Sequence, residues 1–220
     1  MRWGLVLVCS GALGVGCAAA PKPVKYAGDV GGQPSIESLP SLDVGDSELT
    51  AEMQTARQLS AEALQLPAPK VPEGRSSQML TAWSEGEFKS WLEQKQHCAD
   101  DARAELDRAA MQNHRQRIVA GALVGLVYED IARTLLAVPV PSELDSEPEV
   151  SEAFRELLLK QAEPYLIHAR LAYAACAGNA HAMQSMGHWA SFCSGRREGL
   201  PGEAAERDGV EVVVERTATR

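Results

Sequence analysis

Apolar side chains recur at intervals of three and four residues along the chain, the spacing that places them on one face of an α-helix. Residues 49–66 predict one helix, residues from about 78 to 111 a longer one, and residues from about 114 to 138 a third. Gly86 weakens the early part of the second pattern, so a break is expected near residue 85. Prolines follow the first and third patterns directly and end those helices.

A fourth helix is expected to begin near Pro148, because proline is favoured in the first turn of a helix. Its apolar stripe continues to residue 176. Pro164 lies inside this stripe and should kink the helix or split it into two. A further helix holds Trp189 and Cys193.

The pattern predicts an all-α fold, an antiparallel helical bundle. Composition agrees, because Ala and Leu are frequent, aromatic residues make up 5% of the chain, and β-branched runs are scarce. Residues 49–66 form either an independent arm or the first helix of the bundle. We divide the chain into a signal peptide (1–16), a lipidated flexible tether (17–48), a helix with a proline-rich linker (49–75), a helical domain (76–195) and a disordered tail (196–220).

The tail contains VEVVV, residues 210–214, which has strand propensity but no partner strand elsewhere in the chain. Disorder is the expectation for this segment. Addition of a strand to the sheet edge of a partner is the alternative.

The segment IVAGALVGLV, residues 118–127, is apolar throughout but has only ten residues, whereas a span of the bilayer takes about 20. Gly121 and Gly125 form a small-xxx-small step, which lets two helices approach closely. We interpret the step as tight packing in a protein core, with membrane dimerisation as the alternative. This segment is expected to be the central core helix.

The first residues have the pattern of a secretory signal peptide. Arg2 precedes an apolar stretch, residues 3–16, that is too short to span a bilayer and gives way to Pro21 and Lys22. This segment is therefore expected to be removed from the mature protein.

The sequence around Cys17 resembles the bacterial lipoprotein box, in which a small residue precedes a cysteine that is acylated and becomes the mature N-terminus. Gly16 stands in the preceding position. Ala18 differs from the aspartate that signals retention in the inner membrane, so the resemblance implies an outer-membrane lipoprotein facing the periplasm. The alternative is a secreted or cell-surface protein cut near Ala20.

The net charge of the mature chain limits the classes of partner that it can bind. Removal of residues 1–16 leaves 20 basic and 30 acidic residues, a formal charge of about −10. An acidic surface disfavours nucleic acid, whose phosphates bind Lys and Arg. The expected partners are envelope proteins, together with the membrane through the lipid anchor.

Three cysteines remain beyond Cys17, and export permits a disulfide between two of them. If the chain reverses at residues 184–187, Cys176 and Cys193 face each other across a helical hairpin, as a Cα separation of about 4.4–6.8 Å requires. A turn at residues 178–179 would instead separate them by roughly 20 Å. We favour the first arrangement, which leaves Cys98 as a small buried thiol.

The segments GALVGLVYEDIARTLLAVPVP, PYLIHARLAYAACAGNA and HWASFC resemble the C-terminal helical region of tetratricopeptide-repeat-like cell-envelope proteins of myxobacteria. The resemblance covers about 115 residues and implies short TPR-like helical hairpins. It also implies a scaffold role in an envelope assembly, in some relatives one connected with gliding motility. The residues that carry it are Tyr128, Glu129, Asp130, Pro139, Pro141, Tyr173, Cys176, Trp189 and Cys193.

We expect no catalytic site, no cofactor and no small-molecule substrate. His181, His188 and Cys193 are separated by seven and five residues, which matches neither His-Glu-x-x-His nor Cys-x-x-Cys. A periplasmic metal-binding protein or enzyme that uses these three residues is the alternative. The favoured function is a helical scaffold or adaptor that binds protein partners, with Tyr128, Tyr173 and Trp189 as packing or contact aromatics.

Overall fold

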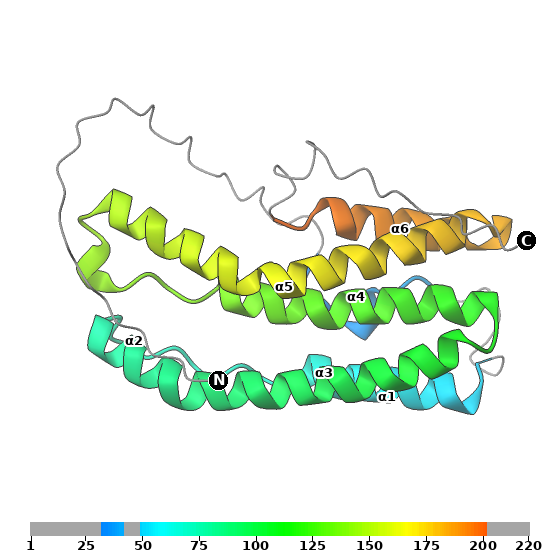
Figure 1. The fold of residues 1–220 in the computed structure, drawn as a ribbon, viewed down its shortest axis with the longest axis horizontal. Helices are drawn as coiled ribbons and strands as arrows, with labels where there is room; N and C mark the ends of the chain where they lie inside the picture. Colours follow the sequence, from blue (N-terminus) through cyan, green and yellow to red (C-terminus); the bar gives the residue numbers. More distant parts are fainter. Residues whose placement is uncertain (1–31, 42–48, 202–220) are drawn as a thin grey trace, which may run out of the picture.

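The computed structural model describes residues 32–41 and 49–201, and this part of the chain is all-helical, as predicted (Figure 1). The helices are α1 (Ala51–Gln65), α2 (Ser77–Trp83), α3 (Lys89–Ala110), α4 (His114–Leu136), α5 (Pro148–His181) and α6 (Gly187–Glu198). Shorter helical turns are η1 (Ile36–Ser38), η3 (Ser84–Phe88), η4 (Ser142–Leu144) and η5 (Gln184–Met186).

Polar side chains fix where several helices begin. Thr50 accepts a hydrogen bond from the backbone N–H of Met53 at 3.3 Å, and Asn113 accepts one from Gln116 at 2.9 Å. Each bond satisfies a backbone donor that the first turn leaves without a partner. α5 begins with Pro148, as its sequence predicts.

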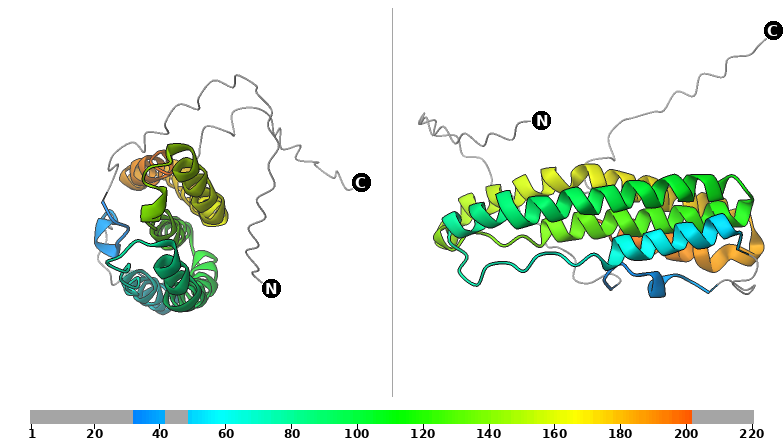
Figure 2. Two further views of the ribbon diagram at one scale, coloured as in Figure 1. Left: turned by 90° about the vertical axis from the view of Figure 1, so that its left-hand side faces the viewer. Right: turned by 90° about the horizontal axis from the view of Figure 1, so that it is seen from below.

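The long helices run side by side as an antiparallel bundle, seen end-on in Figure 2. α4 packs most extensively against α5, α6 folds back on α5, and α1 lies against α3 and α4. Met53, Ala56 and Ala63 of α1 have no exposed surface. Residues 51–65 therefore form part of the bundle core, not an independent arm.

α4 is the central helix of the bundle. A Cβ atom on Gly125 would lie 2.4 Å from Cε1 of Tyr173, and one on Gly121 would lie 3.1 Å from the carbonyl oxygen of Ala172. Both glycines thus let α4 approach α5 closely, which confirms tight core packing. No helix in residues 32–41 and 49–201 is both long enough and apolar enough to cross a bilayer.

The break expected near residue 85 does not occur. α2, η3 and α3 follow one another without interruption from Ser77 to Ala110, a rod of 34 residues that we call the α2/α3 rod. η3 is a π-helical turn around Gly86. A single π turn accommodates the irregular stretch while the buried side chains on both sides, Trp83 and Phe88, stay in the core.

Pro164 does not split α5, which is continuous over 34 residues. Figure 1 shows the helix changing direction near its middle, where Pro164 lies. Proline removes one backbone hydrogen bond and bends a helix. Because Pro164 is exposed, water can hydrate the carbonyl group that loses its partner.

Two predicted boundaries are corrected. The tether was expected to extend to residue 48, but residues 32–41 pack on the bundle. Arg196 donates to the carbonyl oxygen of Gly32 at 2.9 Å, and a ring nitrogen of His188 lies 2.9 Å from the carbonyl oxygen of Ser41. Residues 196–198, assigned to the tail, complete α6, and Leu200, which follows the helix, is buried. The apolar run 210–214 lies outside the described residues.

Candidate functional site

The sulfur atoms of Cys176 and Cys193 are 2.04 Å apart, at bonding distance, and their Cα atoms are 6.1 Å apart. The chain reverses through η5, at residues 184–186, which is the turn that the favoured pairing required. Cys98 is a free thiol on α3, but it is half-buried, whereas a buried thiol was expected. Cys17, the predicted acylation site, lies outside the described residues.

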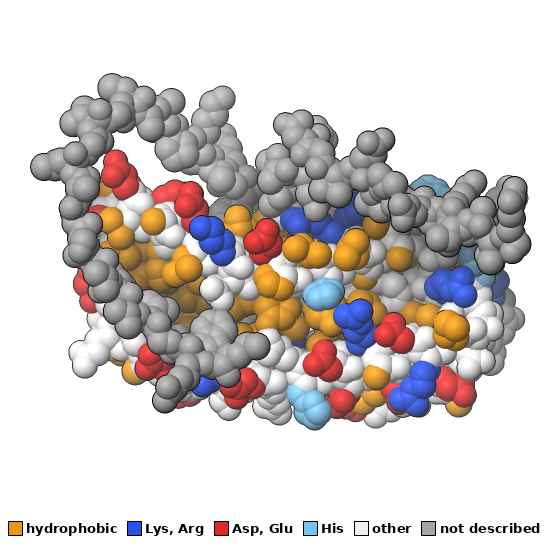
Figure 3. Space-filling view, in the orientation of Figure 1, with side chains coloured by type: hydrophobic (Ala, Val, Ile, Leu, Met, Phe, Trp, Pro, Cys, Tyr) orange, Lys and Arg blue, Asp and Glu red, His pale blue; other side chains and the backbone are white. Residues whose placement is uncertain are grey.

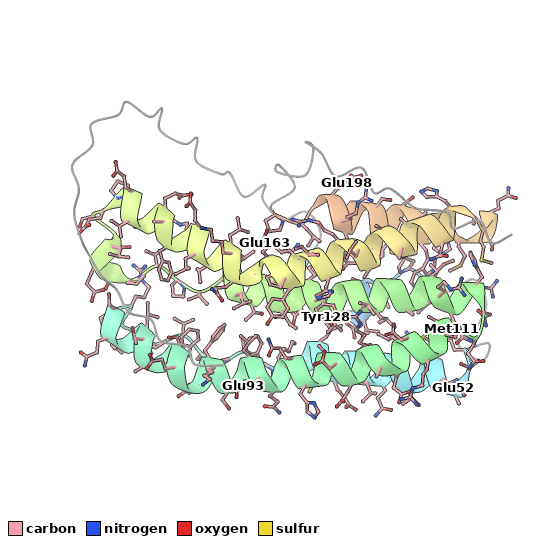
Figure 4. All side chains as sticks on the ribbon, in the orientation of Figure 1. Glu52, Glu93, Met111, Tyr128, Glu163 and Glu198 are labelled. Carbon is pink, nitrogen blue, oxygen red and sulfur yellow. A yellow bond between two sulfur atoms is a disulfide. The ribbon has the colours of Figure 1, made fainter. Side chains whose placement is uncertain are left out.

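The three aromatic residues named from the sequence are all buried. Tyr173 and Trp189 are 0% and 1% exposed, so they pack within the bundle and offer no surface to a partner. Tyr128 lies between α4 and α3 (Figure 4) and its ring stacks on His168 at 4.9 Å. Arg103 of α3 donates to its hydroxyl at 3.2 Å.

A buried carboxylate, that of Glu129, connects α4, α5 and α6. Glu129 on α4 accepts a hydrogen bond from Arg133 at 2.7 Å through one oxygen. Its other oxygen accepts one from Tyr173 at 2.6 Å and one from Arg196 at 3.0 Å. Both oxygens are thereby satisfied, as burial of a charge requires.

The same carboxylate changes the acidity of its neighbour. Burial, followed by the negative charge of Glu129 and the hydrogen bond to it, raises the pKa of Tyr173 well above its usual value. Tyr173 therefore stays protonated and serves as a hydrogen-bond donor. This cluster orients helices and exposes no nucleophile.

A second buried ion pair lies between α3 and α4. The ammonium group of Lys95 has no exposed surface and lies 2.6 Å from Oδ2 of Asp130. It also donates to the carbonyl oxygen of Ala63, which ties α1 into the pair. Burial raises the pKa of Asp130, and the hydrogen bond from Lys95 counteracts part of this rise.

The predicted alternative, a metal site, loses one of its ligands. Cys193 is at bonding distance from Cys176, so its sulfur is not available as a thiolate. Nowhere in the described part of the chain do three His, Cys, Asp or Glu side chains come together as a metal site would need.

Two carboxylates in the connection between α4 and α5, those of Glu143 and Asp145, have local partners. The carboxylate oxygens of Glu143 accept hydrogen bonds from the backbone N–H of Ser77 at 2.9 and 3.0 Å, at the start of α2. These bonds lower the pKa of Glu143. Asp145 pairs with Arg75 at 2.8 Å, so the two carboxylates fasten the α4–α5 connection to α2.

One end of the bundle is open, a feature that the sequence analysis missed. Figure 3 shows apolar side chains in a depression between α5 and α2, with acidic side chains on both sides of it. A cavity of about 330 Å³ lies at this end of the bundle, and we call it the apolar hollow. It is lined by Leu136, Val138, Pro139, Val140 and Leu158, with Arg75, Asp145 and Arg155 at its edge.

Apolar surface continues from the apolar hollow onto α5. Val150 and Leu157 are 43% and 44% exposed, and Phe154 and Leu158 between and beside them are half-buried. On α2, at the same end, Met79 is 45% exposed. Such a contiguous patch is unusual for a surface that faces only water.

The polar groups at the edge of the apolar hollow already have partners. Arg75 donates to the carbonyl oxygen of Val140 at 3.0 Å and to Asp145, and Arg155 donates to Glu152 at 3.2 Å. The apolar surface that remains for a ligand lies beside the cavity, on the exposed side chains of Val150, Leu157 and Met79. This arrangement suits the side chains of another protein better than a charged small molecule.

Comparison with known proteins adds no relative. No family model, no curated protein and no solved structure matches this chain.

Proposed function

We propose that this protein is an acyl-anchored helical scaffold or adaptor of the bacterial cell envelope that binds a protein partner at the apolar hollow. The observation that carries the proposal is the open end of the bundle, where α5 and α2 leave apolar side chains uncovered. An apolar patch with a charged rim is the usual anatomy of a protein interface.

The interior of the bundle supports a structural role. Its buried charges, Glu129 and Asp130, are each paired with a basic residue from a different helix, Arg196 and Lys95. Buried ion pairs between helices favour the one arrangement that brings their charges together. The chain is thus a rigid platform on which a binding surface keeps its shape.

The proposed location follows from the predicted acylation of Cys17 and its resemblance to lipoproteins. The sulfur pair of Cys176 and Cys193 supports an oxidising compartment such as the periplasm. Acyl chains would hold the protein on the outer membrane without a membrane-spanning helix. The myxobacterial resemblance extends the proposal to envelope assemblies, including those of gliding motility.

The anchor is tested by comparing the wild-type chain with Cys17→Ala in the native host. We expect mass spectrometry to find acyl groups on a chain that begins at Cys17, and fractionation to place it in the outer membrane. The variant should leave the membrane fraction. An unprocessed N-terminus on a cytosolic wild-type protein, or unmodified protein in the medium, would contradict the anchor.

The partner surface is tested with a photo-crosslinking amino acid at Leu157, beside the apolar hollow. Met111, 80% exposed at the opposite end of the bundle (Figure 4), is the matched control position. We expect a discrete protein adduct from position 157 in intact cells and none from position 111. Equal labelling from both positions, or none from 157, would contradict the scaffold proposal.

A further inference from the structure

The apolar hollow arises because the central helix is shorter than its two neighbours. The α2/α3 rod and α5 each have 34 residues, whereas α4 has 23. At 1.5 Å per residue, α5 is ~51 Å long and α4 ~34 Å, so roughly 16 Å of both outer helices extends past the end of α4. The length missing from the middle corresponds to about 11 residues, or three helical turns.

The connection from α4 to α5 fills only part of this space. Pro139 and Pro141 prevent α4 from continuing, and the chain crosses the gap as an irregular segment. The apolar hollow remains beside it, walled by Leu136 and Leu158. Its volume admits a few apolar side chains from a helix lying across its mouth, but not the helix itself.

The charges around the apolar hollow favour an occupant with net positive charge. Residues 142–163 contain seven acidic and two basic side chains, and η3 adds the exposed Glu85 and Glu87 at the same end of the bundle. Arg75, at the edge of the apolar hollow, is already paired with Asp145. Figure 3 shows acidic side chains along both sides of the depression. Lys and Arg residues flanking an apolar stripe would reach these rims with their long side chains.

Two other candidate occupants carry net negative charge. A second copy of the chain is acidic, with a formal charge of −9 for the full sequence. The segment 202–220 has five acidic and three basic residues. Both would bring net negative charge to a negative rim, which is unfavourable.

We infer that the apolar hollow binds the apolar side chains of a basic amphipathic helix of about three turns, supplied by a partner protein, which lies across its mouth beyond the end of α4. This inference rests on the proposed scaffold function and specifies the chemistry of the partner. The mode is that of a helix in a groove, in which apolar residues at positions i, i+3, i+4 and i+7 enter and basic residues remain outside.

The experiment measures binding of fluorescent 14-residue peptides to the purified full chain by anisotropy. The probe places leucines on one helical face and lysines on the other. One control peptide has the same composition in an order that destroys the face, and another has glutamate in place of lysine. We expect the probe to bind at least tenfold more tightly than either control and to weaken as salt rises.

Leu157→Glu should lower the affinity for the probe at least tenfold, and charge reversal of Glu85 and Glu87 to lysine should lower it too. Leu171→Glu, on the same helix beyond the apolar hollow and 64% exposed in the wild type, is the matched control and should bind like wild type. All three sites are exposed, so circular dichroism should report unchanged folding.

Equal binding of the reordered peptide, or equal losses for Leu157→Glu and Leu171→Glu, would overturn the inference. Dimerisation abolished by Leu157→Glu would make a second copy the occupant and overturn it as well. So would binding that appears only after removal of residues 202–220. If the probe does not bind but position 157 gives an adduct in cells, the inference fails and the scaffold proposal stands. If the probe binds but position 157 gives no adduct in cells, the scaffold proposal fails and the inference about the helix stands.

Discussion

Arg196 on α6 donates a hydrogen bond at 3.0 Å to the carboxylate of Glu129 on α4, 67 residues earlier in the chain. The two side chains are only 7% and 1% exposed. Arg133 and Tyr173 bind the same carboxylate, so one acidic group connects α4, α5 and α6. The bundle depends on this group because it supplies the counter-charge for the buried guanidinium of Arg196 and the acceptor for the buried hydroxyl of Tyr173.

Glu129→Ala should lower the free energy of unfolding by about 3–5 kcal/mol, because it leaves the guanidinium of Arg196 buried without a counter-charge. Urea denaturation at neutral pH measures the change. Glu152→Ala is the control, since Glu152 pairs with Arg155 at 3.2 Å on the surface. We expect it to cost less than ~1 kcal/mol. Similar losses in both variants would show that the buried network contributes no more than a surface pair.

Tyr173→Phe should lower the free energy of unfolding by about 1.5–3 kcal/mol at neutral pH, through loss of a hydrogen bond to a charged group. The deficit should shrink at alkaline pH. Burial and Glu129 raise the pKa of Tyr173 in the folded protein, so the unfolded chain releases this proton first and wild type loses stability as pH rises above about 10.

Phenylalanine has no proton to release, so the variant lacks that part of the loss. Urea denaturation of both proteins at pH 7 and about pH 11 gives the two differences to compare. A deficit that is the same at both values would mean that Tyr173 ionises in the folded protein as it does in the unfolded chain.

Gly125→Ala should destabilise the bundle by ~1–3 kcal/mol or more, because the new methyl group would lie 2.4 Å from the ring of Tyr173. Gly178→Ala is the matched control on α5, where a Cβ atom meets nothing within 4 Å. Alanine there should stabilise the helix by about 0.5–1 kcal/mol. Thermal and urea unfolding compare the two. Equal changes in the free energy of unfolding for Gly125→Ala and Gly178→Ala would show that packing of α4 on α5 does not require a glycine at position 125.

Features set by local chemistry were predictable from the sequence. The helix starts at Thr50 and Pro148, and the turn before Gly187, follow from caps, proline and apolar spacing. Local signals misled where packing outweighed them. Gly86 was expected to interrupt its helix, but it is exposed, and the buried residues on either side keep the helix continuous. Pro164 bends α5 without splitting it, which is one of the two outcomes expected for it.

Long-range features had weaker signals. Lys95 lies on the apolar stripe of α3, four residues from Trp91 and from Ala99, and a charge on a buried face requires a partner. Periodicity could indicate this need but not that the partner is Asp130. The contacts of residues 32–41 run through the backbone carbonyl groups of Gly32 and Ser41, which every residue type possesses.

The apolar hollow was predictable in principle, because the expected helices from 78 to 111 and from 148 onward are longer than the one between them. What the sequence does not contain is the alignment of the helices at one end. That alignment follows from the contact of His114 with the carbonyl oxygen of Asn179 at 3.0 Å, which places the start of α4 beside the end of α5.

Cys176→Ser combined with Cys193→Ser should lower the free energy of unfolding by ~3 kcal/mol, the value for a cross-linked loop of about 15 residues in the unfolded chain. The separation here is 17 residues. Reduction of the wild type should produce a similar loss, measured by urea denaturation with and without dithiothreitol. Cys98→Ser, which alters the free thiol on α3, is the control and should change stability by less than about 1 kcal/mol.

Peptide mapping without reduction tests the pairing itself. A disulfide between residues 176 and 193 closes the α5–α6 hairpin a few residues from Tyr173 and Arg196, so it also holds the donors of Glu129 in place. In the double cysteine variant, Glu129 should therefore stabilise the fold less. Glu129→Ala should lower the free energy of unfolding by a smaller amount in that background than in wild type. A linked pair that includes Cys98, or strictly additive losses, would contradict this coupling between the sulfur bridge and the buried carboxylate.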